Sequence, residues 1–289
     1  MSVRIVTDST CDLPEAVAAR LGITVVPCYI NIGGESLLDG VELSRQEFYS
    51  RMPELPEPPT TSAPGIAAFV NAYERLGSEG ATEIVSLHIS ATLSNVVSVA
   101  RLAAQAVESI PVTVLDPGQL TLGTGLVALK AAEAAEAGAS ASAIVALAGG
   151  LAPRTHSFAV LHTLEYLRRS GRVSRLASGL GTLLSIRPLL KMNNGRIDME
   201  RVRTRQGAIE RMLALVRGLG PLEQLALVHS NAPEAGESLR RQAADLFPVG
   251  ATPLIGEVTP VIGAHVGPGA VGLVCIAAHQ TSDEKCLGA

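Results

Sequence analysis

The sequence predicts an α/β fold with two domains, an N-terminal one with a mostly parallel sheet and crossover helices and a C-terminal one with a mixed sheet. In the first half of the 289 residues, short apolar runs alternate with stretches of helical spacing, which is typical of parallel strands joined by right-handed crossovers. In the second half, a β-hairpin around residues 193–195 (Asn-Asn-Gly) interrupts this alternation. A Gly-Gly-Leu-Ala-Pro stretch at residues 149–153 predicts the boundary. We therefore expect domains over residues 1–149 and 150–289.

The elements of the first half follow from hydrophobic periodicity and turn residues. We expect strands over residues 3–8, 24–32, 84–89 and 112–116, and helices over residues 14–22, 42–52, 66–77, 95–107 and 122–137. Ser44 is the expected N-cap of the second helix, with Glu47 as its capping-box partner. Residues 53–65 are expected to form a rigid loop, because their prolines fit neither a helix interior nor a central strand.

The second half continues the alternation with strands over residues 157–163, 225–229, 252–258 and 271–277 and helices over residues 207–217 and 234–246. The hairpin spans residues 186–204. A short helical stretch after residue 163 leads into an interrupted segment, and residues 259–270 are expected to be a loop before the last strand.

The composition argues against several classes of function. The net charge is −4, and only 3% of the residues are aromatic, with no Trp, so a nucleic-acid interface is disfavoured. The four cysteines form no CxxC pair and no metal-ligand spacing with His, so we expect no metal and reduced thiols. The apolar part of the N-terminus is too short for a signal peptide. The longest uncharged stretch is interrupted by His265, Pro268 and several glycines. We therefore expect a cytoplasmic protein with no integral membrane segment.

Four stretches place polar groups where strands or loops are expected to end, which is where α/β sheets bind ligands. They are residues 7–10 (TDST), residues 60–62 (TTS), residues 90–95 (SATLSN) and the loop that contains His265. Local structure explains each of them as well. Asp8 or Ser9 would cap a turn and Asp12 the next helix, hydroxyls before Pro64 would cap another helix, and Ser94 would cap the helix over residues 95–107.

A segment at residues 123–128 matches the GxGxxA dinucleotide pattern. That pattern requires its glycines in the turn directly after a strand, and here a longer spacer precedes Gly123. Close helix packing through small residues is the better interpretation. The sequence contains no GxxxxGK[ST], HExxH or GxSxG motif.

Five motifs taken together, in this order, resemble the DegV family of bacterial fatty-acid-binding proteins: VRIVTDSTCDLP, TTSAPG, SLHISATLSN, YLRRSGRVS and TPVIGAHVGPGAVG. Some members of that family are the acyl-carrying subunits of fatty acid kinase. The resemblance extends from Val3 to about Ala278. It implies a DegV-like fold of two α/β domains, with one fatty acid buried between and within them.

The resemblance also implies site residues. Thr61 matches the Thr of the family's Thr-Ser-x-Pro motif, and Ser94 matches a Ser in its hydroxyl-rich turn, so these two hydroxyls would hold the carboxyl group. Arg172 and His265 match an Arg and a His that lie near the acyl head in kinase-associated members. Where the family's turn carries glycines, this chain has Thr92 and Asn95, and a positive φ at Thr92 would strain the turn.

The sequence is compatible with three functions. The favoured one is a non-catalytic protein, without cofactor, that binds a long-chain fatty acid such as palmitate and presents its carboxyl group to a separate dihydroxyacetone-kinase-like fatty acid kinase. Burial of the chain would contribute roughly 0.8 kcal/mol per CH₂. The second is an acyl hydrolase or acyltransferase with Ser94 as nucleophile and His265 as base. The third is a nucleotide-binding enzyme that uses residues 123–128.

Overall fold

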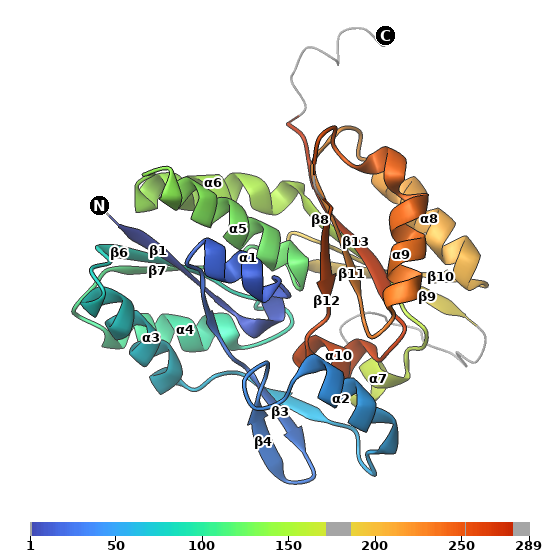
Figure 1. Ribbon diagram of the computed structural model, residues 1–289, viewed down its shortest axis with the longest axis horizontal. Helices are drawn as coiled ribbons and strands as arrows, with labels where there is room; N and C mark the ends of the chain where they lie inside the picture. Colours follow the sequence, from blue (N-terminus) through green and yellow to red (C-terminus); the bar gives the residue numbers. More distant parts are fainter. Residues whose placement is uncertain (1, 172–185, 252, 280–289) are drawn as a thin grey trace, which may run out of the picture.

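The structure is a computed structural model that describes residues 2–171, 186–251 and 253–279. The strands of these residues form three sheets, with orders β2-β1-β6-β7, β10-β9-β8-β13-β11-β12 and β4-β3-β5. Figure 1 shows the first sheet with its helices on one side of the molecule, the second sheet on the other, and the small sheet below them. The predicted mixed α/β architecture is confirmed.

The four-stranded sheet is parallel throughout, as the sequence predicts. Its strands are β1 Val3–Asp8, β2 Thr24–Val26, β6 Glu83–Leu87 and β7 Val112–Leu115. Its helices are α1 Glu15–Arg20, α3 Ile66–Ser78, α4 Val96–Ala106, α5 Leu122–Glu136 and α6 Ala141–Leu151. Helices α3 and α4 cover one face of the sheet, and α5 and α6 cover the other (Figure 1). The central strands β1 and β6 are therefore buried on both faces, which explains their continuous apolar runs.

The predicted strand over residues 24–32 is wrong as a single element. It breaks near Pro27, which has no N–H for a ladder, into β2 and a strand of the small antiparallel sheet. That sheet consists of β3 Tyr29–Ile32, β4 Glu35–Leu38 and β5 Thr60–Ser62. Strand β5 corrects the expected loop over residues 53–65. It lies at the sheet edge, where neighbouring prolines are tolerated.

Helix α2 spans Arg45–Arg51 and begins as expected, because the Ser44 side chain accepts a hydrogen bond from the Glu47 N–H at 3.2 Å. The Glu47 carboxylate accepts from Arg51 one turn further on rather than from the Ser44 N–H, so the reciprocal bond of the predicted capping box does not form. The 3₁₀ turn η2 Met52–Glu54 follows directly.

The six-stranded sheet is mixed, with one parallel pair, β11 with β12, among its described strands. Its strands are β8 Thr155–Val160, β9 Arg187–Asn193, β10 Arg196–Val202, β11 Leu222–His229, β12 Leu254–Glu257 and β13 Val271–Ala277. Helices α8 Arg205–Arg217 and α9 Pro233–Gln242 cover its outer face (Figure 1). The predicted hairpin is confirmed, with Asn194 and Gly195 at positive φ in its turn.

Two helices were not predicted. Helix α6 runs through Gly149 and Gly150, and the turn η3 Ala152–Arg154 then leads into β8. Helix α10 Pro260–Val266 replaces the expected loop. It has seven residues and Gly267 as its C-cap, so it is too short to show helical periodicity. Helix α7 Glu165–Arg169 lies beside it (Figure 1).

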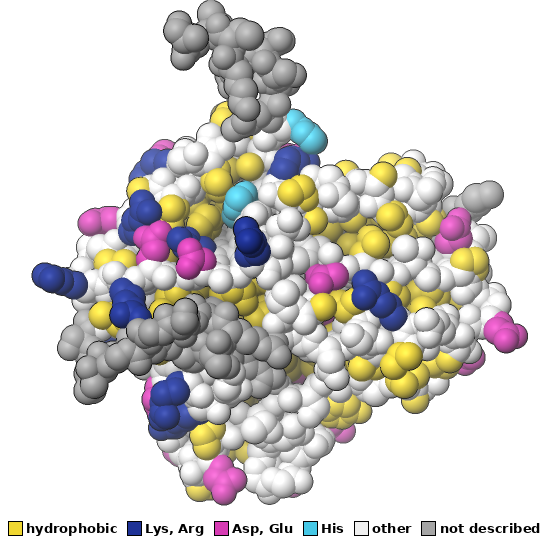
Figure 2. Space-filling model, turned by 180° about the vertical axis from the view of Figure 1, so that it is seen from behind, with side chains coloured by type: hydrophobic (Ala, Val, Ile, Leu, Met, Phe, Trp, Pro, Cys, Tyr) yellow, Lys and Arg dark blue, Asp and Glu magenta, His cyan; other side chains and the backbone are white. Residues whose placement is uncertain are grey.

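One apolar core extends across the proposed domain boundary. Leu126 of α5 and Val274 of β13, both fully buried, belong to the same cluster. A second cluster lies between the outer face of the six-stranded sheet and helices α8 and α9. No helix of the described residues is long and apolar enough to cross a membrane. On the described part of the face in Figure 2, basic and acidic side chains are interspersed, without a basic stripe.

Candidate functional site

A cavity of about 750 Å³ lies between the parallel sheet and the inner face of the six-stranded sheet. Thr10, Ile89 and Leu120, which line it, follow the carboxyl ends of β1, β6 and β7. This is the edge where parallel sheets bind ligands. Strands β8, β9 and β13 and helix α10 form the other wall, which is mostly apolar.

Three of the four residues singled out by the resemblance line this cavity: Thr61, Ser94 and His265. Thr61 Oγ1 and His265 Nε2 are hydrogen-bonded at 2.9 Å. Thr61 lies on edge strand β5 rather than in a loop, and its neighbouring hydroxyls do not cap α3, whose N-cap is Gly65. His265 lies in the last turn of α10. Arg172 lies outside the described residues.

Helix α10 is anchored on several sides. The Tyr49 hydroxyl donates to the Val258 carbonyl oxygen at 3.0 Å, and the Thr259 N–H donates to the Asp12 carboxylate at 2.8 Å. At the other end, Gly267 has a φ of +73°, and a Cβ there would lie 2.1 Å from the Tyr166 ring. A glycine is therefore required where α10 packs against α7. These contacts fix the position of His265.

The turn that carries Ser94 is held by hydrogen bonds rather than by glycines. Ala91 N–H donates to the Asp116 carboxylate at 2.9 Å, and Ser94 N–H donates to the Ser90 carbonyl at 3.2 Å. Thr92 does not have positive φ, so the expected strain is absent. The N-cap of α4 is Asn95. The interpretation of Ser94 as that N-cap is therefore wrong.

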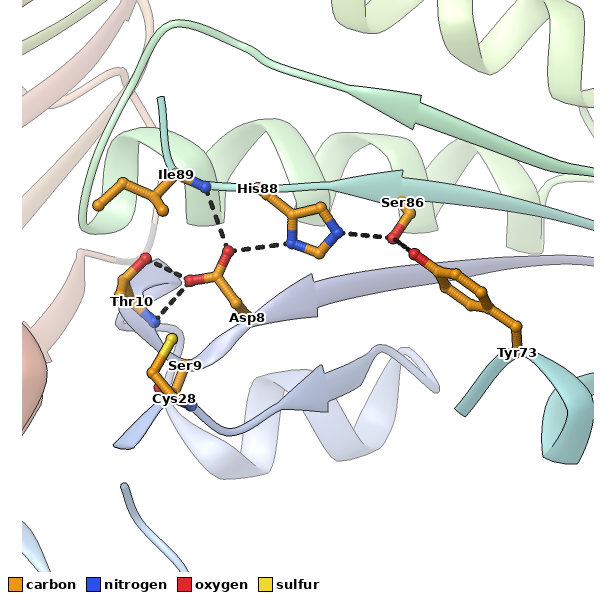
Figure 3. Close-up of polar contacts among 8 residues, drawn as sticks. All are labelled: Asp8, Ser9, Thr10, Cys28, Tyr73, Ser86, His88 and Ile89. Carbon is orange, nitrogen blue, oxygen red and sulfur yellow. Dashed lines mark hydrogen bonds and ion pairs between the residues drawn. The ribbon is translucent and has the colours of Figure 1, made fainter. Parts of the chain in front are cut away.

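A fully buried polar network lies behind the cavity wall (Figure 3). The Asp8 carboxylate contacts His88 Nδ1 at 3.0 Å and accepts from the Ile89 N–H at 3.2 Å. His88 Nε2 contacts Ser86 Oγ at 2.7 Å, and Ser86 contacts the Tyr73 hydroxyl at 2.9 Å. The order Ser-His-Asp is that of a hydrolase triad. Ser86, His88 and Asp8 are all 0% exposed and do not line the cavity, so we interpret the network as structural.

Asp8 is ionised in this network. Burial by itself would raise its pKa, but the hydrogen bond from His88, the attraction to that ring and the hydrogen bonds from Thr10 and the Ile89 N–H together lower the pKa below the ordinary value. Asp8 also caps the 3₁₀ turn η1 Ser9–Cys11 through the Thr10 N–H, as the sequence predicts. The sequence contained no periodic signal for the partnership with His88, since the two residues are 80 positions apart.

Asp12 does not cap α1, contrary to the expectation from sequence, because that helix begins after Pro14. Its carboxylate instead accepts hydrogen bonds from the Thr121 hydroxyl and the Thr259 N–H. Burial raises the pKa of Asp12 to about 6, although both hydrogen bonds oppose that shift. Burial likewise raises the pKa of Asp39 to about 7, opposed by the hydrogen bond from Ser9.

The structure does not support the alternative sites, which are a dinucleotide site at residues 123–128 and a Ser94–His265 catalytic pair. Gly123 and Gly125 lie inside α5, not in a turn after a strand. A Cβ on Gly125 would lie 2.4 Å from the Cys11 carbonyl oxygen, so the glycines serve close packing. His265 bonds Thr61, which gives no support to a Ser94–His265 nucleophile pair. Among the described residues, no group of three or more His, Cys, Asp or Glu side chains could hold a metal ion.

Comparisons with known proteins agree with this architecture. A family model described as "Uncharacterised protein, DegV family" matches residues 2–278. A DegV domain-containing protein of Streptomyces coelicolor is 39% identical over 275 residues, which cover 94% of this chain and 97% of that one. Another from Deinococcus radiodurans is 40% identical over 280 residues, with 94% and 98% covered.

Two solved structures share the fold over nearly the whole chain. One, described as "Fatty Acid Binding of a DegV family Protein from Thermus thermophilus", is 35% identical with a TM-score of 0.87, and covers 96% of this chain and 100% of that one. The other, from Bacillus subtilis, is described as DegV, a fatty acid binding protein. It is 30% identical with a TM-score of 0.87, and the coverage is 96% and 99%.

Proposed function

Since this chain belongs to the DegV family, we propose that it binds a long-chain fatty acid such as palmitate in the cavity, with the carboxyl group at Thr61, Ser94 and His265. The observation that carries the proposal is the hydrogen-bonded pair of Thr61 and His265 at the edge of a large, mostly apolar cavity. The Thermus and Bacillus relatives are described as fatty-acid-binding proteins.

The cavity offers apolar side chains to the hydrocarbon chain of a fatty acid and hydroxyl groups to its carboxyl group. Burial of the hydrocarbon chain contributes roughly 0.8 kcal/mol per CH₂, so a long saturated chain offers on the order of 10 kcal/mol before the costs of association. A buried carboxylate without donors would be costly. Hydroxyl groups at Thr61 and Ser94 supply donors for it.

The Thr61–His265 contact determines how Thr61 can serve. A hydroxyl has one hydrogen, so Thr61 can donate to a carboxylate only if His265 Nε2 carries a proton and donates to Thr61. Binding of an ionised fatty acid therefore selects a His265 ring with Nε2 protonated. In this arrangement, His265 orients the Thr61 hydroxyl toward the carboxyl group and also lies near that group itself.

The remaining parts of the proposal rest on the sequence resemblance. Arg172 would add positive charge near the acyl head. The protein would be a non-catalytic carrier in the cytoplasm that presents the carboxyl group to a separate kinase. The boundary between its two domains would lie near residue 149. The absence of a phosphate-binding motif from the sequence supports placing the phosphoryl-transfer chemistry in a partner.

Extraction of the purified protein into organic solvent, followed by mass spectrometry, tests the proposal. We expect a long-chain fatty acid at close to one molecule per chain, or uptake of palmitate by the delipidated protein. Failure to find or load any long-chain acid would overturn the proposal. Steady ester turnover that disappears in Ser94→Ala would favour a hydrolase instead.

A further inference from the structure

Besides Thr61 and Ser94, five residues that line the cavity carry a hydroxyl group: Thr10, Ser62, Ser98, Thr121 and Ser157. Three of them, Thr10, Thr121 and Ser157, donate the hydroxyl hydrogen to another residue of the protein. Thr10 donates to Asp8 and Thr121 to Asp12, while Ser157 donates to Gln119 Oε1 at 2.9 Å. We call these three hydroxyls the acceptor patch. None of the three accepts a hydrogen bond from a residue that the structure describes.

The direction of each hydrogen bond follows from its partner. An ionised carboxylate can only accept, and Asp8 is ionised in its network with His88. Asp12, whose pKa is about 6, is ionised at the pH 8 of the test below, so it accepts both the Thr259 N–H and the Thr121 hydroxyl through its two oxygens. The Gln119 amide is oriented by Nε2, which donates to the Thr155 carbonyl at 2.6 Å, so Oε1 must be the atom that faces Ser157. Each hydroxyl therefore has lone pairs, and no hydrogen, left for the cavity.

The acceptor patch surrounds the first turns of α5. Thr121 is the N-cap of that helix. A Cβ on Gly123 would lie 2.7 Å from Ser157 Oγ, and a Cβ on Gly125 would lie 2.4 Å from the carbonyl of Cys11, the residue after Thr10. Thr121 has a φ of 50° and a ψ of −145°, a strained conformation for a residue with a side chain, of the kind that clusters at ligand sites.

We propose that the acceptor patch recognises a hydroxyl group on the acyl chain, so that the cavity takes a hydroxylated fatty acid as well as, or in preference to, the unsubstituted acid. This inference rests on the proposed function. The lone pairs of these hydroxyls, next to the carboxylates of Asp8 and Asp12, would repel the carboxylate of a fatty acid. The acceptor patch therefore cannot serve as a second site for the carboxyl group. A hydroxyl on the chain supplies the missing donor, and the surrounding apolar wall holds the rest of the chain.

The test compares octadecanoic acid with a panel of octadecanoic acids that each carry one hydroxyl group at a different carbon. Affinities are measured at pH 8 for the delipidated wild type and for Ser157→Ala and Thr10→Val. The measured quantity is the dissociation constant of octadecanoic acid divided by that of each hydroxylated acid. We expect at least one isomer whose ratio falls roughly fivefold in one or both variants, as expected for one lost hydrogen bond.

Thr124→Val is the matched control. Thr124 lies on α5, is fully buried, and its hydroxyl does not line the cavity, so its removal should leave every ratio unchanged. Equal ratios in the wild type and in both patch variants, for every isomer, would overturn the inference while the proposed function stands. If neither octadecanoic acid nor any hydroxylated isomer binds, the proposed function fails, and the inference with it.

Discussion

Thr61 and His265 are 204 positions apart in the chain and are hydrogen-bonded at 2.9 Å between Oγ1 and Nε2. One belongs to the edge strand of the small sheet, and the other to a seven-residue helix before the last strand of the six-stranded sheet. The pair therefore joins two distant parts of the chain at the cavity. It also couples the donor capacity of Thr61 to the protonation of His265.

Thr61→Val should weaken fatty-acid binding by about 1–3 kcal/mol, because it removes a donor to a buried carboxylate. Calorimetric titration with palmitate measures the change. Thr60→Val is the matched control on the same strand. Thr60 is exposed, bonds Asn31 and does not line the cavity, so its variant should bind like the wild type. Equal affinity of the two variants would remove Thr61 from the site.

Ser94→Ala should also weaken binding by roughly 1–3 kcal/mol. Ser98, one helical turn after Ser94, is a useful comparison. It lies in α4 and lines the same cavity, but in our proposal it does not bind the carboxyl group. Ser98→Ala should change palmitate affinity by less than the Ser94 variant does. A larger loss for Ser98 would mean that the head lies deeper along α4 than we propose.

Asp12→Asn should change how stability depends on pH. The pKa of Asp12 in the folded protein is about 6, above its ordinary value of 3.8. The stability linked to this group is therefore fully present below about pH 3.8 and is lost as the pH rises through about 6. Asn does not titrate, can still accept from the Thr259 N–H, and can donate to Thr121.

The difference in stability between Asp12→Asn and the wild type should therefore favour the variant more at pH 8 than at pH 4. The titration of Asp12 itself contributes about 3 kcal/mol to that change. Urea denaturation at several pH values measures the difference. The neighbouring charged groups are Asp39 and Arg45. The Asp12 charge raises the pKa of Asp39, so the variant lowers that pKa, and this second effect also favours the variant at the higher pH. A difference that does not vary with pH would contradict this account.

Gly267→Ala should destabilise the protein more than Gly138→Ala does. Both glycines have positive φ, but a Cβ at Gly267 would lie 2.1 Å from the Tyr166 ring, whereas none of the surrounding atoms lies within 4 Å of a Cβ at Gly138. Gly138→Ala measures backbone strain alone, on the order of 1 kcal/mol. Thermal denaturation should show a clearly larger loss for Gly267→Ala, and equal losses would mean that Tyr166 moves aside freely.

His88→Leu should cost about 2–3 kcal/mol of folding stability, because it removes the hydrogen bond between His88 Nδ1 and the buried Asp8 carboxylate. Tyr73→Phe, at the other end of the network, removes one neutral hydrogen bond and should cost about 1 kcal/mol. Chemical denaturation compares the two variants. Similar losses would indicate that the network is not organised around Asp8.

The elements that the sequence predicted well have strong local signals. The central parallel strands β1 and β6 are buried on both faces and form continuous apolar runs in the sequence. Ser44 caps α2, and Asn194-Gly195 forms the hairpin turn. The missed elements lack such signals. Strand β5 follows a proline-rich stretch and is held by its partner β3, and α10 is short and held by Tyr49, Asp12 and Tyr166.

By itself, the sequence determined the α/β class, most of its elements and, through five ordered motifs, Thr61, Ser94 and His265 as residues of interest. Each of these depends on local periodicity or on residue identity. Only the tertiary structure decided that His265 bonds Thr61 and that Asp12 accepts hydrogen bonds from Thr121 and Thr259. The physical reason is that a hydrogen-bond partner a hundred or more residues away is selected by how sheets and helices pack, and no local pattern in the chain records that packing.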